Sequence, residues 1–313
     1  MKKRRWKRGV LIGLLAFFGF IIADYWIYPN LPIGGESQNR NRNGIWLRYK
    51  WYFGETTNYD LLADQFQQGG IKYAYFHVRF IERSGKLHFR YPEKARRLNA
   101  EVQKRSPDVL RIAWIYAGNP RGEGNVEISK PEVRQKMVSE AKWLIEECGF
   151  QGIQWDYEIC PDRDPDFLKL LAETRRALPG VHLSAAVPTM YDWPLRGFSW
   201  SPEYMSQVAE HLDQFAVMTY DTGMYLPRMF AGHVRGNVQK FAKAANGKSV
   251  IMGVPTYGPG FLSHNPRAES LKVALMALRT VDLPANVEGI APFADYTMDA
   301  EEWKLLRDYW TGR

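Results

Sequence analysis

Three polar side chains alternate along one short, otherwise apolar segment of the chain, residues 150–158. Successive side chains of a β-strand point to opposite faces, so Gln154, Asp156 and Glu158 share one face. Two carboxyl groups two residues apart disfavour their joint ionisation, which raises the pKa of one of them. A carboxyl group that stays protonated near neutral pH can serve as a general acid. The spacing therefore predicts an acid–base site, provided that this face lines the inside of a sheet rather than meeting solvent.

Short apolar runs recur after residue 44, and stretches of helical character separate them. We expect strands at 45–49, 73–78, 112–116, 152–158, 182–187, 214–220, 250–255 and 289–294. We expect helices near 58–69, 91–105, 130–148, 164–178, 201–211, 228–246, 267–279 and 299–310. Eight strand–helix repeats predict a single α/β domain, a (β/α)₈ TIM barrel. An open, doubly wound sheet is the alternative, and the barrel is favoured because no glycine-rich dinucleotide turn follows the first strand.

The barrel interpretation indicates where the chemistry lies, because active sites of such barrels sit where the strands end. Glu158 would then be the residue of the fourth strand nearest the catalytic rim. His77 lies at the end of the second strand and Trp114 near the end of the third, so both are candidates for contact with a substrate. Tyr257 follows the seventh strand, and aromatic rings in these connections can stack on sugar rings.

The N-terminal region accounts for the charge imbalance of the chain. Residues 1–50 hold ten Lys and Arg against two acidic residues, whereas the rest of the chain is balanced. Residues 1–8 carry six positive charges, and the apolar residues 9–28 are long enough to cross roughly 30 Å of hydrocarbon. We expect a cytoplasmic basic segment at 1–8, a transmembrane signal anchor at 9–28, a linker at 29–43 and the barrel at 44–313. A cleaved signal peptide is the alternative, and both interpretations export the barrel.

Composition and spacing argue against several classes of function. The body of the chain lacks the net positive charge of a nucleic-acid-binding protein. The six histidines have no metal-ligand spacing, and there is neither a nucleotide-binding loop nor a nucleophile elbow, so we expect no metal and no cofactor. Cys148 and Cys160 flank the expected fourth strand, whose ends lie roughly 20 Å apart, so both are expected to be free thiols.

Several motifs together resemble glycoside hydrolase family 18, the chitinase-like barrels. Residues 151–158 read Q-G-I-Q-W-D-Y-E, which is similar to the D-G-x-D-x-D-x-E signature on the fourth strand of that family. Residues 213–221 end in M-T-Y-D, which resembles the M-x-Y-D motif of its sixth strand. Weaker matches follow in the order of the fifth, seventh and eighth strands, at 183–188, 253–258 and 289–293. The resemblance covers roughly residues 44–310.

The resemblance implies a retaining, substrate-assisted mechanism, in which the 2-acetamido oxygen of the sugar is the nucleophile. Glu158 would protonate the leaving oxygen. Asp156 would orient the acetamido group and stabilise its developing positive charge, and Tyr220 would donate a hydrogen bond to its oxygen. Met218 and Asp221 of the same sixth-strand motif would line the substrate site.

Three positions depart from the family pattern. Gln151 and Gln154 replace the first and second aspartates of the signature, and Phe293 stands where the family commonly has a sugar-stacking tryptophan. Gln154 is expected to donate a hydrogen bond to Asp156 without being able to take its proton, which keeps Asp156 anionic. Gln154 and Phe293 are both expected to contact the substrate.

The sequence therefore predicts an exported glycosidase, anchored through residues 9–28 in a bacterial-type inner or plasma membrane, with its barrel periplasmic or extracellular. Its substrate would be a polysaccharide or oligosaccharide that contains β-linked N-acetylhexosamine, such as a cell-wall polymer, and no nucleic acid. The departures from the family pattern favour one alternative, a non-catalytic, lectin-like barrel at the cell surface. A further alternative is a different polysaccharide hydrolase that uses Asp156 and Glu158 in another arrangement.

Overall fold

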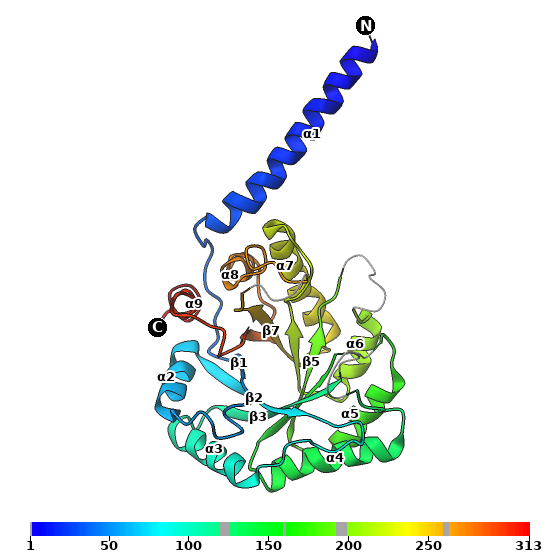
Figure 1. Cartoon of the computed structure of the whole chain (residues 1–313), viewed down its shortest axis with the longest axis vertical. Coiled ribbons are helices and arrows are strands. Elements are labelled where there is room, and N and C mark those ends of the chain that lie inside the picture. The colour runs from blue at the N-terminus through cyan, green and yellow to red at the C-terminus, as the bar shows by residue number, and fades with distance from the viewer. Residues whose placement is uncertain (1, 119–124, 159–160, 192–198, 259–262) are drawn as a thin grey trace.

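The computed structural model describes residues 2–118, 125–158, 161–191, 199–258 and 263–313. The helices are Lys2–Ile27 (α1), Tyr59–Gly69 (α2), Pro92–Arg105 (α3), Pro131–Glu146 (α4), Pro165–Ala177 (α5), Pro202–Ala209 (α6), Pro227–Ala244 (α7), Leu271–Leu278 (α8) and Ala300–Leu306 (α9). The strands are Asn43–Leu47 (β1), Ile71–Phe80 (β2), Leu110–Gly118 (β3), Gly152–Tyr157 (β4), His182–Pro188 (β5), Gln214–Met218 (β6), Ser249–Pro255 (β7) and Val287–Phe293 (β8). The predicted alternation of strand and helix is confirmed, and the domain is a TIM barrel (Figure 1).

Each strand pairs in parallel with the next, and β8 returns beside β1 so that the barrel is nearly closed. The side chain of Asn43 bridges the seam, because its Oδ1 accepts a hydrogen bond from the Ile290 amide at 3.1 Å. Above it, the Asp295 amide donates to the Trp46 carbonyl at 3.0 Å. A Cβ on Gly289 would lie 2.5 Å from Asn43 Oδ1, so the missing side chain is what allows the two strands to approach.

The predicted alternation of side chains along β4 is also confirmed. Ile153 and Trp155 face outward into the apolar layer between barrel and helices, and Trp155 Nε1 donates to Thr174 Oγ1 of α5 at 3.1 Å. Gln154 and Asp156 face inward and are fully buried. The polar face of the strand therefore lies inside the barrel, where each polar group needs a partner.

A network of neutral polar side chains fills the middle of the barrel. The Tyr75 hydroxyl donates to Gln214 Oε1 at 2.6 Å, and Trp46 Nε1 donates to Gln154 Oε1 at 2.9 Å. Gln154 Nε2 in turn donates to Ser184 Oγ at 3.2 Å. Because these groups satisfy one another, the centre of the barrel is a packed core and not a channel.

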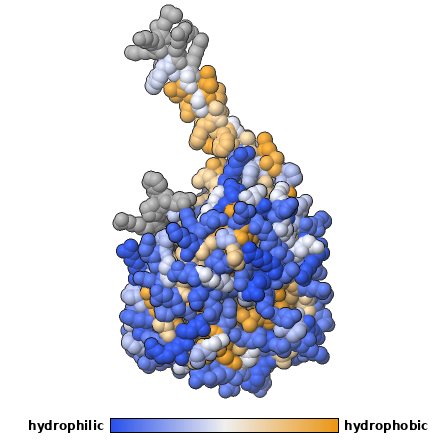
Figure 2. All heavy atoms as spheres, turned by 180° about the vertical axis from the view of Figure 1, so that it is seen from behind, coloured by the Kyte–Doolittle hydropathy of each residue, from blue (hydrophilic) through white to orange (hydrophobic). Residues whose placement is uncertain are grey.

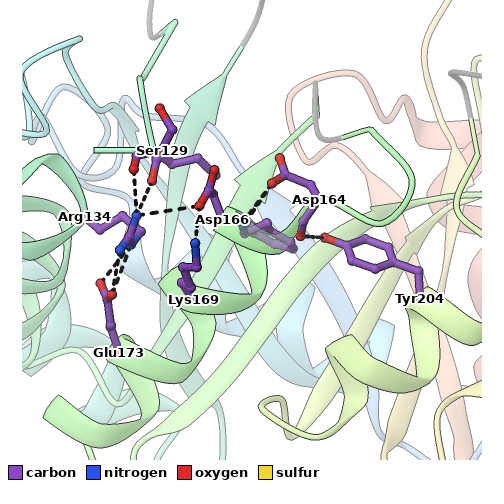
Figure 3. A network of polar contacts seen from close by, with 9 residues as sticks. Ser129, Arg134, Asp164, Asp166, Lys169, Glu173 and Tyr204 are labelled. Carbon is purple, nitrogen blue, oxygen red and sulfur yellow. Dashed lines mark hydrogen bonds and ion pairs between the residues drawn. The ribbon is translucent and has the colours of Figure 1, made fainter. Parts of the chain in front are cut away.

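A buried guanidinium joins the helices that flank β4 (Figure 3). Arg134 of α4 donates from Nε to Glu173 Oε1 of α5 at 3.1 Å and from Nη1 to the Ile128 carbonyl at 2.7 Å. The carboxylate of Asp164 caps the first turn of α5. The backbone carbonyl of Asp164 accepts a hydrogen bond from the Tyr204 hydroxyl of α6 at 2.8 Å. These contacts brace the start of α5, the helix that follows β4, from outside the barrel.

Helix α1 projects away from the barrel, and its surface is apolar along most of its length (Figures 1 and 2). The 22-residue segment Gly9–Asn30, which contains an 18-residue window with a mean hydropathy of 2.2, is long and apolar enough to cross a membrane. A signal sequence near an N-terminus has the same length and composition. By these criteria α1 is a candidate membrane span.

The segment predicted as a linker lies along the outside of the barrel, next to the connection between α8 and β8. Gln38 Nε2 donates to the Val281 carbonyl at 2.5 Å. The guanidinium of Arg40 donates to the carbonyls of Pro284 at 3.0 Å and of Ala285 at 2.8 Å. These contacts fix the path of the chain from α1 to β1.

Candidate active site

A pocket of about 350 Å³ opens at the C-terminal ends of β2, β3, β4 and β8. Its lining combines aromatic with ionisable side chains: His77, Arg79, Phe80, Trp114, Tyr116, Asp156, Glu158, Phe293 and Tyr296. A larger hollow of about 570 Å³ lies beside α2 and the start of β3, at the end of the barrel where the strands begin. Because barrel active sites lie at the strand ends, the smaller pocket is the candidate site.

Asp156 is held at the base of this pocket by one strong hydrogen bond. Trp114 Nε1 donates to its Oδ2 at 2.7 Å. Its Oδ1 is buried and has no hydrogen-bond partner within the described residues. Burial and the nearby Glu158 carboxyl raise the pKa of Asp156 well above its usual value, although the Trp114 bond favours the anion. The carboxyl group therefore has one free acceptor position for a donor that arrives with a ligand.

Glu158 lies directly after β4, at the rim of the pocket, where its side chain still reaches solvent. Partial desolvation by the pocket walls, together with the Asp221 carboxylate, raises the pKa of Glu158 to about 7. A hydrogen bond from Tyr116 opposes this shift. The sequence predicts one raised pKa in this pair, whereas in the structure the pKa values of both carboxyl groups are raised. Near neutral pH, Glu158 can therefore both hold and release a proton, which a general acid–base residue must do.

His77 and Trp114 form one side of the pocket. Their rings stack with centroids 4.0 Å apart. Burial and the neighbouring Arg79 guanidinium lower the pKa of His77 to about 3, so the imidazole is neutral at physiological pH. Its Nε2 is buried and unpaired among the residues that the structure places. Trp114 thus serves Asp156 as a hydrogen-bond donor and His77 as a packing surface.

Aromatic rings form the floor of the pocket. Phe293 stacks on Tyr220 with centroids 4.8 Å apart, and it contacts Trp46 and Trp114 edge-on at 5.7 Å and 6.1 Å. Tyr220 is almost fully buried, and burial is the main reason that its pKa is raised well above the usual value. Its hydroxyl therefore keeps its proton and remains a hydrogen-bond donor at neutral pH.

The connection after β6 is held by a buried carboxylate. Glu269 is fully buried, and it accepts hydrogen bonds from the Thr222 hydroxyl at 2.6 Å and the Thr222 amide at 3.1 Å. His264 Nδ1 lies 3.5 Å from Glu269 Oε2 and 4.0 Å from Asp221 Oδ1. Asp221 itself adopts a left-handed conformation, with φ of 53° and a side chain that is 42% exposed. The Tyr257 ring stacks on His264, which places it between this loop and the pocket floor.

Comparison with known proteins identifies the family. The family model of glycosyl hydrolases family 18 matches residues 48–305. The chain belongs to this family. A probable chitinase 10 of Drosophila melanogaster is 23% identical over 214 residues, which cover 58% of this chain and 9% of that protein. The chain thus spans about a tenth of the length of this relative.

Two solved structures share the fold of this chain. A chitinase of Cycas revoluta in complex with (GlcNAc)₃ superposes with a TM-score of 0.62 at 15% identity, covering 86% of this chain and 99% of the other. The spore cortex-lytic enzyme SleL of Bacillus cereus gives a TM-score of 0.60 at 14% identity, covering 88% and 75%. At these identities the likeness establishes the fold alone, and roles of individual residues rest on the local geometry of this chain.

The two glutamines that depart from the family signature have structural partners. Gln154 is bonded to Trp46 and Ser184, so the expected hydrogen bond from Gln154 to Asp156 is wrong, and Gln154 does not line the pocket. Gln151 lies before the start of β4, at the opposite end of the barrel from the pocket. The expected persistence of an Asp156 anion is likewise contradicted, because burial raises its pKa.

The predicted contact residues divide into two groups. His77, Trp114 and Phe293 line the pocket together with Asp156 and Glu158. The others lie nearby but outside its lining: Met218, half-buried at the end of β6; Tyr220 and Tyr257, in the aromatic floor; and Asp221, on the β6–α7 connection.

Sequence reasoning missed two lining residues, Phe80 and Tyr296, and one residue, Glu269, that fixes a loop. Phe80 and Tyr296 line the pocket from the ends of β2 and β8, and Tyr116 bonds Glu158 from β3. Their position at strand ends was the available signal. Glu269 carries no such signal, because nothing in its sequence neighbourhood indicates that its partner is Thr222 on another connection.

Within the described ranges, no group of three or more His, Cys, Asp or Glu side chains is placed to hold a metal ion. Cys148 is a buried free thiol, and burial raises its pKa to about 12. Cys160, the other expected free thiol, lies outside the described residues.

Proposed function

We propose that this family 18 protein is a membrane-anchored, exported glycoside hydrolase that cleaves a β-linked N-acetylhexosamine glycan by substrate-assisted acid catalysis. One observation carries the proposal. A buried carboxyl group, Asp156, has one oxygen bound by Trp114 and the other free, and it lies two residues from a rim carboxyl group whose pKa is about 7. A non-catalytic binding site has no need of such a proton-exchanging group beside a half-satisfied carboxylate.

The sugar to be cleaved would sit above Phe293, with its 2-acetamido group directed to the base of the pocket. The acetamido N–H would donate to the free Oδ1 of Asp156, and the Tyr220 hydroxyl would hold the acetamido oxygen. Binding would thereby satisfy Asp156 Oδ1, a buried acceptor that has no partner among the described residues. A second donor and the developing positive charge both favour the anionic form, so they would counteract the raised pKa of Asp156.

The reaction would then proceed in two balanced steps. In the first, the acetamido oxygen forms a bond to the anomeric carbon while the glycosidic bond breaks, and the leaving oxygen takes the proton of Glu158. In the second, Glu158 as a carboxylate takes a proton from water, whose oxygen attacks the anomeric carbon and reopens the oxazolinium ring. Each turnover returns Glu158 to its protonated form and retains the anomeric configuration.

The choice of test substrates follows from the relatives. One neighbouring structure contains (GlcNAc)₃ and another is a spore cortex-lytic enzyme, so chitin oligosaccharides and bacterial cell-wall glycan are both appropriate. The anchoring part of the proposal rests on the apolar segment Gly9–Asn30 and the basic residues before it.

The decisive experiment measures hydrolysis of both substrates by the full chain in detergent micelles, with Glu158→Gln as the test variant. Glu203→Gln is the matched control, because this residue is exposed on α6 and distant from the pocket. We expect Glu158→Gln to lose a factor of about 10² to 10⁴ in kcat, the usual contribution of a general acid. Full activity of that variant would refute the assignment.

Glycan binding and inhibition by a thiazoline distinguish this proposal from the two alternative functions. Saturable glycan binding without turnover by the wild-type chain would establish a lectin-like barrel. A thiazoline that mimics the oxazoline intermediate should inhibit a substrate-assisted enzyme tightly. Turnover that this compound leaves unaffected would indicate a hydrolase that uses Asp156 and Glu158 in a different arrangement.

A further inference from the structure

The last turn of α1 is docked on the barrel through a buried acidic residue. Asp24 is almost completely inaccessible, and its Oδ1 lies 3.0 Å from Nε of Arg228. Its Oδ2 also accepts a hydrogen bond from the Arg228 amide at 3.3 Å. Both oxygens of the buried Asp24 carboxylate thus face Arg228, and removing the arginine side chain would leave the carboxylate buried without a cation.

A second arginine holds the neighbouring residues of α1. Arg267 Nε donates to the Tyr25 carbonyl at 2.7 Å, and its guanidinium lies 4.1 Å from the centre of the Trp26 ring. Arg228 of α7 and Arg267 of the β7–α8 connection therefore both contact the last turn of α1. The anchor is therefore fixed in position at its barrel end, which a cleaved signal peptide would not require.

Both arginines belong to the catalytic end of the barrel. Arg228 is the second residue of α7, directly after the β6–α7 connection that carries Asp221. Arg267 lies in the β7–α8 connection. In the sequence it falls between His264 and Glu269, whose side chains contact each other within this connection. In Figure 1, α1 accordingly leaves the barrel beside α7 and α8. The candidate membrane span thus meets the barrel at the end where the pocket opens and not at the opposite end.

The surface around this contact has the composition of a membrane interface. Tyr225 and Met229, which flank Arg228, are 50% and 56% exposed, and Trp26 is also exposed. Outside α1, large apolar side chains this exposed are few among the described residues: Leu31, Leu61, Tyr225, Met229 and Tyr296. Aromatic residues and arginines next to the end of a span favour the headgroup layer of a bilayer.

We infer that the rim of the barrel formed by residues 219–229 and 263–270 lies against the lipid headgroups, so that the pocket opens at the membrane surface. The inference rests on the proposed anchoring by α1. It narrows the proposed substrate to glycan that lies close to the bilayer. A barrel on a flexible tether could reach glycan farther away, whereas a pocket fixed at the membrane surface could not.

The test places an environment-sensitive fluorophore at one introduced cysteine of the full chain in phosphatidylcholine vesicles, with Cys160 replaced by serine and the buried Cys148 retained. Met229→Cys reports the proposed interface. Asp108→Cys, exposed before β3 at the far end of the barrel, is its matched control, and Leu15→Cys in the middle of α1 reports insertion. Quenching by lipids that carry a nitroxide in the headgroup region measures the proximity of each site to the bilayer.

We expect strong quenching at position 229, little at 108, and quenching by acyl-chain nitroxides at 15. Arg228→Ala with Arg267→Ala should remove the quenching at 229, whereas Lys243→Ala with Lys248→Ala, an equal change of charge at the other end of α7, should preserve it. Insertion at 15 with equal quenching at 229 and 108 would refute the orientation while leaving the anchor intact. Absence of insertion at 15 would overturn the inference together with the anchoring, and neither outcome depends on glycan hydrolysis.

Discussion

The hydrogen bond from Trp114 to Asp156 offers a direct test of whether Asp156 becomes anionic during the reaction. Trp114→Phe keeps an aromatic ring beside His77 but removes the donor that lies 2.7 Å from Oδ2. A hydrogen bond to a neutral group contributes roughly 0.5–1.5 kcal/mol, and one to a charged group roughly 1.5–3 kcal/mol. In the empty pocket, the raised pKa of Asp156 favours its neutral form.

If Asp156 becomes anionic in the transition state, the hydrogen bond from Trp114 strengthens from the neutral to the charged value. The difference between the two values is the stabilisation that the transition state gains over the empty pocket. It amounts to roughly 1–1.5 kcal/mol, which corresponds to about a five- to tenfold loss in kcat/KM. The same substitution also removes an interaction that lowers the pKa of Asp156, so the acid limb of the pH profile should move to higher pH. Steady-state hydrolysis of a chitin oligosaccharide across the pH range measures both effects.

Trp155→Phe is the matched control for this variant. Trp155 lies on the same strand as Asp156, is fully buried, and donates to a neutral hydroxyl, Thr174 Oγ1, outside the barrel. Its loss should lower the free energy of unfolding by roughly 0.5–1.5 kcal/mol without changing kcat/KM. If the two tryptophan variants lost the same stability and retained the same kcat/KM, Asp156 would not develop charge, and the reasoning would fail.

Three other changes test the electrostatics and the packing around the site. Asp221→Asn removes a carboxylate that raises the pKa of Glu158, so the base limb of kcat/KM, expected near pH 7, should shift to lower pH, and an unmoved limb would exclude this coupling. Arg134→Ala should lower the free energy of unfolding by about 2 kcal/mol in urea titrations, because Glu173 and two carbonyls lose a buried donor, and Arg134→Lys should recover part of it. Gly289→Ala should cost at least as much through its clash at the β1–β8 seam, and a wild-type midpoint would show that the seam can open without cost.

The barrel and the face of β4 were predictable because both depend on local periodicity. Alternating apolar runs specify strands, and the two-residue spacing of Asp156 and Glu158 specifies a shared side of one strand. The ends of the strands also indicated His77 and Trp114, whereas Phe293 was indicated by the family resemblance, and all three line one pocket. None of these conclusions requires knowing which distant segments of the chain pack together.

The hydrogen-bond partners of polar side chains were not predictable in this way. Gln154 bonds Trp46, which lies 108 residues earlier in the chain, and not its strand neighbour Asp156. Asp24 interrupts an apolar run in the sequence, and only the fold shows that Arg228 compensates its charge. Both partners depend on which elements the barrel brings together, and a pattern within one segment contains no information about that.

The position of Gln154 leads to a last prediction, on whether this departure from the family signature impairs catalysis. An aspartate there can share a proton with the Asp156 position, whereas Gln154 is fully buried with both of its polar atoms bonded. Gln154→Asp shortens the side chain and strands the Trp46 or Ser184 partner, which should cost roughly 1–3 kcal/mol of stability. If Gln154 is structural, kcat/KM should not rise.

Gln154→Glu separates shape from charge in this argument, because a protonated glutamate can make both hydrogen bonds of the glutamine. Burial would raise its pKa in the folded state above the value of roughly 4.3 in the unfolded chain. The variant should therefore be as stable as wild type below about pH 4 and lose stability as the pH rises toward the folded-state pKa. Urea unfolding at several pH values measures this, and a tenfold gain in kcat/KM for either variant would instead show that a proton relay through this position limits the natural chain.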